Sequence, residues 1–107
     1  MSGYNGWTNY ETWDVALWIG NDEGSDSRAR ELARKAWDDA EDDDEPRDEM
    51  KRTATGTLAD ALKEWIDEDA PGMPASLYSD LLSAALGEVN WYELAENLLE
   101  DVETVNA

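Results

Sequence analysis

Residues 90–102, with the sequence NWYELAENLLEDV, carry the most regular helical pattern in the chain. Their apolar members recur every three or four residues, which places them on one side of an α-helix. Asn90 precedes this stripe and is a favoured capping residue, with Glu93 three residues later as in a capping box. The sequence therefore predicts an amphipathic helix whose buried side is formed by Trp91, Leu94, Ala95, Leu98, Leu99 and Val102.

The same spacing predicts two helices in the first 40 residues. We expect Thr8 to cap the first helix, with Glu11 reaching back to it, and Gly20 to end it. A loop follows, and Ser25 or Asp26 is expected to cap the second helix. The second helix has a clean apolar stripe formed by Ala29, Leu32, Ala33, Ala36, Trp37 and Ala40.

Two more helices are expected between these and the C-terminal one. The third begins near Pro46, a residue suited to the first turn of a helix, and keeps helical spacing to Asp67. Gly56 interrupts it, either as a local break or as a point of close helix contact. The fourth covers roughly 76–86, and its inward-facing residues are expected to be Leu77, Tyr78, Leu81, Leu82 and Ala85.

No alternating strand pattern reaches five residues, so the predicted fold is all-α, a compact bundle-like domain of about five short helices. The 107 residues fit one domain, 1–107. Within it, residues 1–7 are expected to be an extended lead-in and residues 38–49 an acidic segment between helices.

Cysteine and histidine are both missing from the chain. Their absence excludes disulfides, thiolate metal sites, thiol catalysis and any Ser-His triad. We predict no catalytic residue, no metal site and no cofactor. No apolar run approaches the ~20 residues of a membrane span, and the N-terminus lacks the basic region of a signal peptide. A cytoplasmic location without a membrane partner is therefore expected, in the host cell if a phage encodes the chain.

The charge is strongly negative, with 27 Asp and Glu against 8 Lys and Arg and a formal net charge of −19. Such a field repels nucleic acid and anionic membranes, and it accelerates encounter with basic surfaces. Two explanations remain open. The acidity is either adaptation to high salt, or it serves a partner whose natural ligand is a polyanion.

An acidic run lies between the second and third predicted helices and is the first candidate partner-binding site. Its carboxylates could imitate nucleic-acid phosphates, since duplex DNA carries one charge per ~1.7 Å of axis. The alternative is a solvated loop in a halotolerant protein. A calcium loop is disfavoured because the EF-hand spacing is not met. The residues concerned are Asp38, Asp39, Glu41, Asp42, Asp43, Asp44, Glu45, Asp48 and Glu49.

More acid lies at the ends of the third and fifth predicted helices, which would extend this negative surface if those ends meet. The chain also has six tryptophans and no phenylalanine. Most of these tryptophans fall on apolar stripes, where core packing explains them. Trp7, Trp18 and Tyr92 fit the stripes less well and are candidates for an aromatic docking patch. Their acidic neighbours disfavour the stacking of nucleic-acid bases.

Two stretches resemble a known family. They are GWTNYETW at residues 6–13, followed by Leu17-Trp18-Ile19 and Asn21, and ALGEVNW at residues 85–91, followed by Glu93-Leu94-Ala95. Together they are similar to small acidic proteins of unknown function from phages, plasmids and actinobacterial or haloarchaeal mobile elements. The resemblance covers both ends of the chain and implies a mobile-element context without an activity. Helix capping accounts for Asn9 and Glu11 within the first stretch.

The leading hypothesis is a phage-type interaction protein, a DNA mimic that blocks a basic, nucleic-acid-binding host protein of restriction, CRISPR or another system. Direct binding to nucleic acid is not expected. The alternative is a structural or adaptor protein whose acidity is salt adaptation and whose contacts are aromatic. An enzyme is the least favoured class, because only a metal-dependent carboxylate site could serve a chain without His or Cys.

Overall fold

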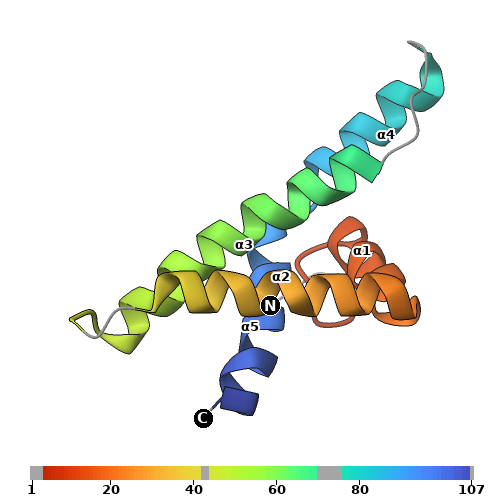
Figure 1. Cartoon of the computed structure of the whole chain (residues 1–107). Helices are drawn as coiled ribbons and strands as arrows, with labels where there is room; N and C mark the ends of the chain where they lie inside the picture. Colours follow the sequence, from red (N-terminus) through yellow and green to blue (C-terminus); the bar gives the residue numbers. More distant parts are fainter. Residues whose placement is uncertain (1–3, 42–43, 70–75, 107) are drawn as a thin grey trace.

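The chain folds into helices throughout the part described by the structure, a computed structural model that covers residues 4–41, 44–69 and 76–106 (Figure 1). Side chains are described for the same ranges except Asp69 and residues 103–106. The predicted all-α fold class is confirmed, and none of these helices is long and apolar enough to cross a membrane. The helices are α1 (Tyr10–Asn21), α2 (Glu23–Ala40), α3 (Arg47–Asp69), α4 (Leu77–Gly87) and α5 (Trp91–Asn106).

The core lies where α2, α3 and α5 pack against one another, and α1 packs against α2 and α5. Leu58, Leu62 and Leu99 are the largest apolar side chains that are fully buried there. The side of α2 that faces them consists mainly of alanines, whose small side chains let the other helices approach closely, together with the buried ring of Trp37. The stripes predicted for α2 and α5 form this core together with residues of α3.

The starts of α1 and α2 are capped by residues other than those expected. Asn9 caps α1, and its Oδ1 accepts a hydrogen bond from the backbone N–H of Thr12. Asp22 caps α2, where its carboxylate accepts hydrogen bonds from the backbone N–H (3.0 Å) and hydroxyl (2.7 Å) of Ser25. These two bonds hold the pKa of Asp22 below its ordinary value. The predicted loop between α1 and α2 is therefore a single residue.

Gly56 neither breaks α3 nor marks a close contact, as α3 is one helix of 23 residues. A Cβ added at Gly56 would meet no heavy atom within 4 Å. Pro46 precedes the helix, and its carbonyl accepts hydrogen bonds from the backbone N–H groups of Glu49 and Met50. The predicted start near Pro46 is thus confirmed to within one residue.

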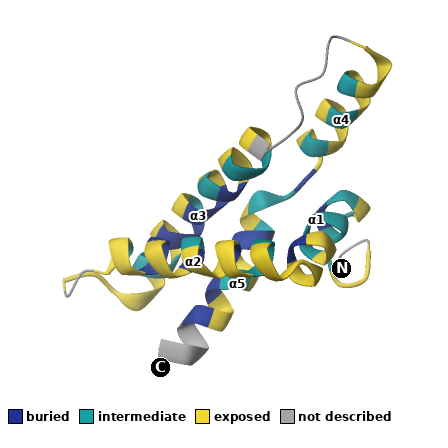
Figure 2. Ribbon diagram, turned by 45° about the vertical axis from the view of Figure 1, so that its right-hand side comes forward, coloured by how far each residue is buried: buried dark blue, intermediate teal, exposed yellow. Residues whose placement is uncertain are grey.

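The helix α4 contradicts the prediction that its apolar residues face inward. Leu77, Tyr78 and Leu81 are 68%, 74% and 58% exposed, and α4 has no buried residue. None of the principal helix pairings includes α4, which projects away from the core beside the C-terminal half of α3 (Figures 1 and 2). Helical spacing showed that α4 has an apolar face, but spacing alone does not show what covers that face.

The N-terminal residues form a reverse turn where an extended lead-in was expected, and residues 1–3 lie outside the described part. Tyr4 and Trp7 exchange two backbone hydrogen bonds of 2.8 and 2.7 Å. Asn5 (φ 46°) and Gly6 (φ 92°) between them are left-handed, as the Asn-Gly pair of a tight hairpin turn requires. The turn folds back on α1, where the ring of Tyr4 lies 5.0 Å from that of Trp13.

Candidate interaction surface

A network of neutral hydrogen bonds joins the start of α1 to the junction between α4 and α5. The Oδ1 of Asn9 accepts from the Thr12 hydroxyl at 2.6 Å, while its Nδ2 donates to the carbonyl of Glu88 at 2.7 Å. Thr12 is fully buried, and its Oγ1 accepts from the backbone N–H of Asn90 at 2.8 Å. We call this network, together with Thr8 and Glu93, the clasp.

The outer part of the clasp ties the first turn of α5 to the segment before α1. The backbone N–H of Thr8 donates to Oε1 of Glu93 at 3.0 Å, and Nδ2 of Asn90 donates to the Thr8 hydroxyl at 3.4 Å. The backbone N–H of Glu93 donates to Oδ1 of Asn90, which confirms Asn90 as the predicted cap of α5. The two family-like stretches are therefore one structural unit, which accounts for Asn9 and Thr12 without assigning them a binding role.

The acidic run between α2 and α3 is exposed wherever the structure describes it, apart from the half-buried Glu49. Asp38 and Asp39 occupy the last turn of α2, and Glu41 follows it. Asp44, Glu45 and Asp48 are also exposed, whereas Asp42 and Asp43 lie outside the described residues.

The chain's own cations neutralise part of this run. Lys35 pairs with Asp39 at 3.0 Å, and Arg52 pairs with Glu49 at 2.9 Å. The guanidinium of Arg47 lies 5.4 Å from the ring centroid of Trp37, a cation–π arrangement. The run is thus acidic but carries compensating charge at both ends.

A second acidic surface follows α5 and was not predicted as a site. Glu93, Glu96 and Glu100 are spaced by three and four residues and line a hollow of about 200 Å³. Trp7 and Gly6 of the N-terminal turn also line this open hollow. Within the described ranges, no three carboxylates are grouped so as to hold a metal ion. The chemistry that this hollow offers is an aromatic ring beside several carboxylates, which suits an organic cation.

The three residues of the predicted aromatic patch line three different hollows. Trp7 is half-buried beside the α5 carboxylates. Trp18 is 71% exposed on α1 and lines an apolar hollow of about 370 Å³ with Val15, Ile19 and Ile66. Tyr92 lines a third hollow, of about 210 Å³, at the start of α3. The structure does not gather these residues into one docking patch.

The start of α3 approaches α5, whereas the end of α3 was expected to extend the negative surface. Glu96 lines both the hollow of Trp7 and that of Tyr92. Asp48, Lys51 and Arg52 also line the hollow of Tyr92, so its charge is mixed. All eight Lys and Arg lie between Arg28 and Lys63, so neither α4 nor α5 contributes a cation.

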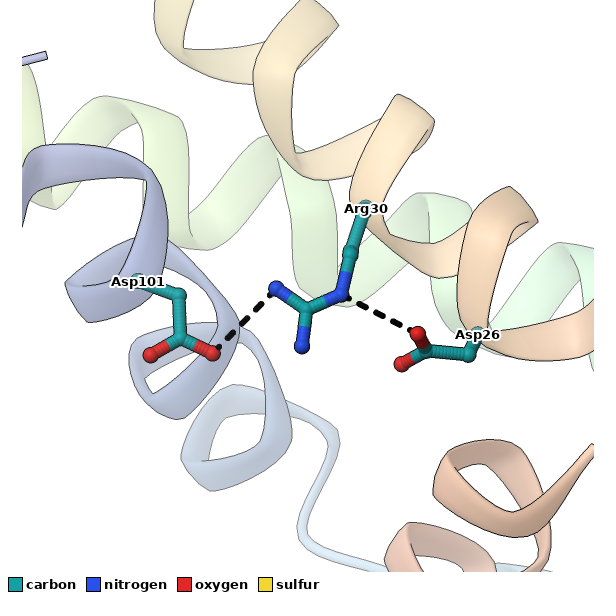
Figure 3. Close-up of polar contacts among 3 residues, drawn as sticks. All are labelled: Asp26, Arg30 and Asp101. Carbon is teal, nitrogen blue, oxygen red and sulfur yellow. Dashed lines mark hydrogen bonds and ion pairs between the residues drawn. The ribbon is translucent and has the colours of Figure 1, made fainter. Parts of the chain in front are cut away.

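One cation of α2 reaches α5. Arg30 pairs with Asp26 of its own helix at 3.1 Å, and with Asp101 of α5 at 3.5 Å (Figure 3). The hydrogen bond and charge of Asp26, with a smaller contribution from Asp101, raise the pKa of Arg30 above its ordinary value. This exposed bridge links α2 to α5, and Asp101 is not among the residues that line the Trp7 hollow.

The fold and surface define a class, a small all-α protein with an acidic exterior and a hydrogen-bonded clasp. The chain belongs to a family of unknown function, DUF7249, whose family model matches residues 1–104. That match includes both stretches that form the clasp. No curated protein and no solved structure matches the chain.

Proposed function

We propose that the chain is an acidic interaction protein, encoded by a phage or another mobile element, that binds a basic host protein through α5. The observation that carries this proposal is the hollow in which Trp7 lies beside Glu93, Glu96 and Glu100. A lysine or arginine of the partner would meet carboxylates on one side and the indole ring on the other. Arg47 and Trp37 show that a cation and an indole already pair within this chain.

The charge spacing along α5 favours a partner that ordinarily binds nucleic acid. Glu93 to Glu100 spans about 10 Å of helix axis, so the three carboxylates lie about 5 Å apart along it. One strand of DNA presents a phosphate every ~3.4 Å, so this row reaches roughly two thirds of that density. The acidic run between α2 and α3 would supply a second row. A host restriction, CRISPR or other nucleic-acid-binding protein is therefore the proposed target.

The test is affinity capture from host lysate by the tagged chain at low salt, followed by stepwise elution with NaCl. We expect one stoichiometric nucleic-acid-binding protein, which duplex DNA releases. Replacing Glu93, Glu96 and Glu100 by glutamine should abolish its capture. Glutamine keeps the carbonyl oxygen that accepts from Thr8, so the clasp is preserved.

The matched control removes three charges from the exposed surface of α3 by Asp60→Asn, Glu64→Gln and Asp67→Asn. A partner that both triple variants lose equally would indicate non-specific attraction and contradict the α5 site. A partner that DNA does not displace would contradict mimicry. Neutralising residues 42–45 in a third variant measures whether the acidic run takes part.

The second candidate function is an adaptor whose contacts are apolar, and it is favoured by the exposed Trp18 beside its apolar hollow. The two functions predict opposite responses to salt. NaCl weakens contacts between carboxylates and a basic partner, whereas it does not weaken apolar contacts and it screens the chain's own repulsion. A captured partner that stays bound in molar NaCl, and is lost in Trp18→Ser, would favour the adaptor.

A further inference from the structure

The apolar hollow beside Trp18 is bounded by three helices and has a volume of about 370 Å³. It separates α1 from α3, which do not form one of the principal helix pairings. Its α1 residues are spaced by three and four positions, so they share one side of that helix. The lining consists of Asp14, Val15, Trp18, Ile19 and Asp22 of the α1 side, Ser25 of α2 and Ile66 of α3.

The charged groups of this hollow are both negative, and one of them lacks a partner. Asp14 is half-buried, and no hydrogen bond or ion pair with the rest of the chain engages its carboxylate. Asp22 differs, because it already accepts two hydrogen bonds from Ser25 as the cap of α2. None of the lining residues is a lysine or arginine. Since charges removed from water are usually paired, Asp14 is suited to receive a cation from outside the chain.

The surroundings of Asp14 are suited to a cation that carries an apolar body. Trp18 follows it by one helical turn and is 71% exposed, so a cation paired with Asp14 can also lie against the indole ring. Val15, Ile19 and Ile66 supply aliphatic surface in the same hollow. A hydrocarbon body placed there would be removed from water while its charged end stays at the carboxylate.

We propose that this hollow binds a small amphiphilic amine, an organic molecule with one ammonium group on an aromatic or aliphatic body. The ammonium pairs with Asp14, and the body covers Trp18 and its aliphatic neighbours. Small-molecule sites are mainly apolar, contain a few converging polar groups and measure about 300–1,000 Å³, and this hollow has those properties. The inference goes beyond the binding of a basic host protein through α5, because the two hollows share no lining residue.

An NMR titration of the full chain with phenethylamine at pH 7 tests this proposal. We expect saturable binding with a dissociation constant on the order of millimolar, and shifts in the backbone amide signals of Val15 and Ile19. Phenethyl alcohol has the same body without the ammonium, and ethylamine has the ammonium without the ring. Each should bind at least about tenfold more weakly, as phenethylamine should to Asp14→Asn and to Trp18→Ser.

Two control variants separate this site from general attraction of amines to an acidic chain. Asp60→Asn removes an exposed carboxylate of α3 that does not line the hollow, and it should leave the dissociation constant within about twofold. The variant with glutamine at Glu93, Glu96 and Glu100 should also bind phenethylamine as wild type does. That result keeps the test independent of the α5 proposal. Far-UV circular dichroism checks that every variant keeps its helices.

Three outcomes would overturn the assignment. Phenethylamine could bind Asp14→Asn as tightly as wild type, or Asp60→Asn could lose as much affinity as Asp14→Asn. Equal affinity for phenethyl alcohol would show that the carboxylate takes no part. A wild-type chain that binds no amine, together with a captured host protein that Trp18→Ser loses, would assign the hollow to a protein contact.

Discussion

Thr12→Val tests the clasp at its centre, because valine matches threonine in shape but lacks the hydroxyl. The variant loses the 2.6 Å hydrogen bond to Asn9 and the 2.8 Å bond from the backbone N–H of Asn90. A net hydrogen bond is worth about 1 kcal/mol, and a buried donor left without a partner costs about 1–3 kcal/mol. The methyl group that replaces the hydroxyl is buried and offsets part of this loss of stability. We expect the free energy of unfolding to fall by about 2–3 kcal/mol in total, with a Tm lower by roughly 10–20 °C.

Urea unfolding followed by tryptophan fluorescence and far-UV circular dichroism measures this loss. Thr12→Ser keeps the hydroxyl and removes one methyl, so it should cost about 1 kcal/mol. Thr57→Val makes the same change as Thr12→Val at an exposed position of α3 and should stay within about 0.5 kcal/mol of wild type. The reasoning is refuted if Thr12→Val is as stable as wild type, or if Thr12→Ser loses as much stability as Thr12→Val.

Three further predictions concern single positions. Gly56→Ala should stabilise the chain by about 0.4–1 kcal/mol in urea unfolding, because the site is helical and an added Cβ meets nothing within 4 Å; a lower stability would mean that the helix surface there is covered. Asn90→Ala should cost about 0.5–2 kcal/mol through loss of the α5 cap, whereas Asn90→Asp should retain the cap in the same assay. The lowered pKa of Asp22 means that its ionised form stabilises the fold above the unfolded-state pKa, and that this contribution disappears as pH falls through the lower folded-state pKa. Wild type should therefore exceed Asp22→Asn in stability at neutral pH, and the difference should narrow in acid titrations; a constant difference would contradict this.

Most helix boundaries were predictable because they depend on local sequence. The apolar stripes of α2 and α5 and the cap at Asn90 lie within a few residues of the backbone they organise. The choice between neighbouring caps was not local. Thr8 and Asn9 are both suitable caps, and the hydrogen bond from Asn9 to the carbonyl of Glu88, 79 residues away, favours Asn9. The Asn5-Gly6 pair did signal a tight turn, and that signal was missed.

The candidate site was predictable only in its composition. Net charge led to the hypothesis of a basic partner, with salt adaptation as the alternative, and both stay predictions. No local pattern connects Trp7 with Glu93, since their proximity depends on the clasp. The exposure of α4 was equally inaccessible. An apolar stripe on a helix has the same spacing in the sequence whether the fold covers it or leaves it exposed. Tertiary contacts between distant segments decided both features.

The interactions that stabilise the fold differ from the charges that make its surface acidic, so the surface charges can be changed without unfolding the chain. The ion pairs that join described side chains are largely exposed, and such pairs contribute little to stability. The clasp instead relies on amide and hydroxyl groups and backbone atoms, whose hydrogen bonds do not depend on ionisation. The carboxylate of Glu93 is the exception, and glutamine can replace it as an acceptor. Removing carboxylates from α5 should therefore reduce self-repulsion and leave the core intact, so a loss of partner binding in those variants reports on the surface and not on unfolding.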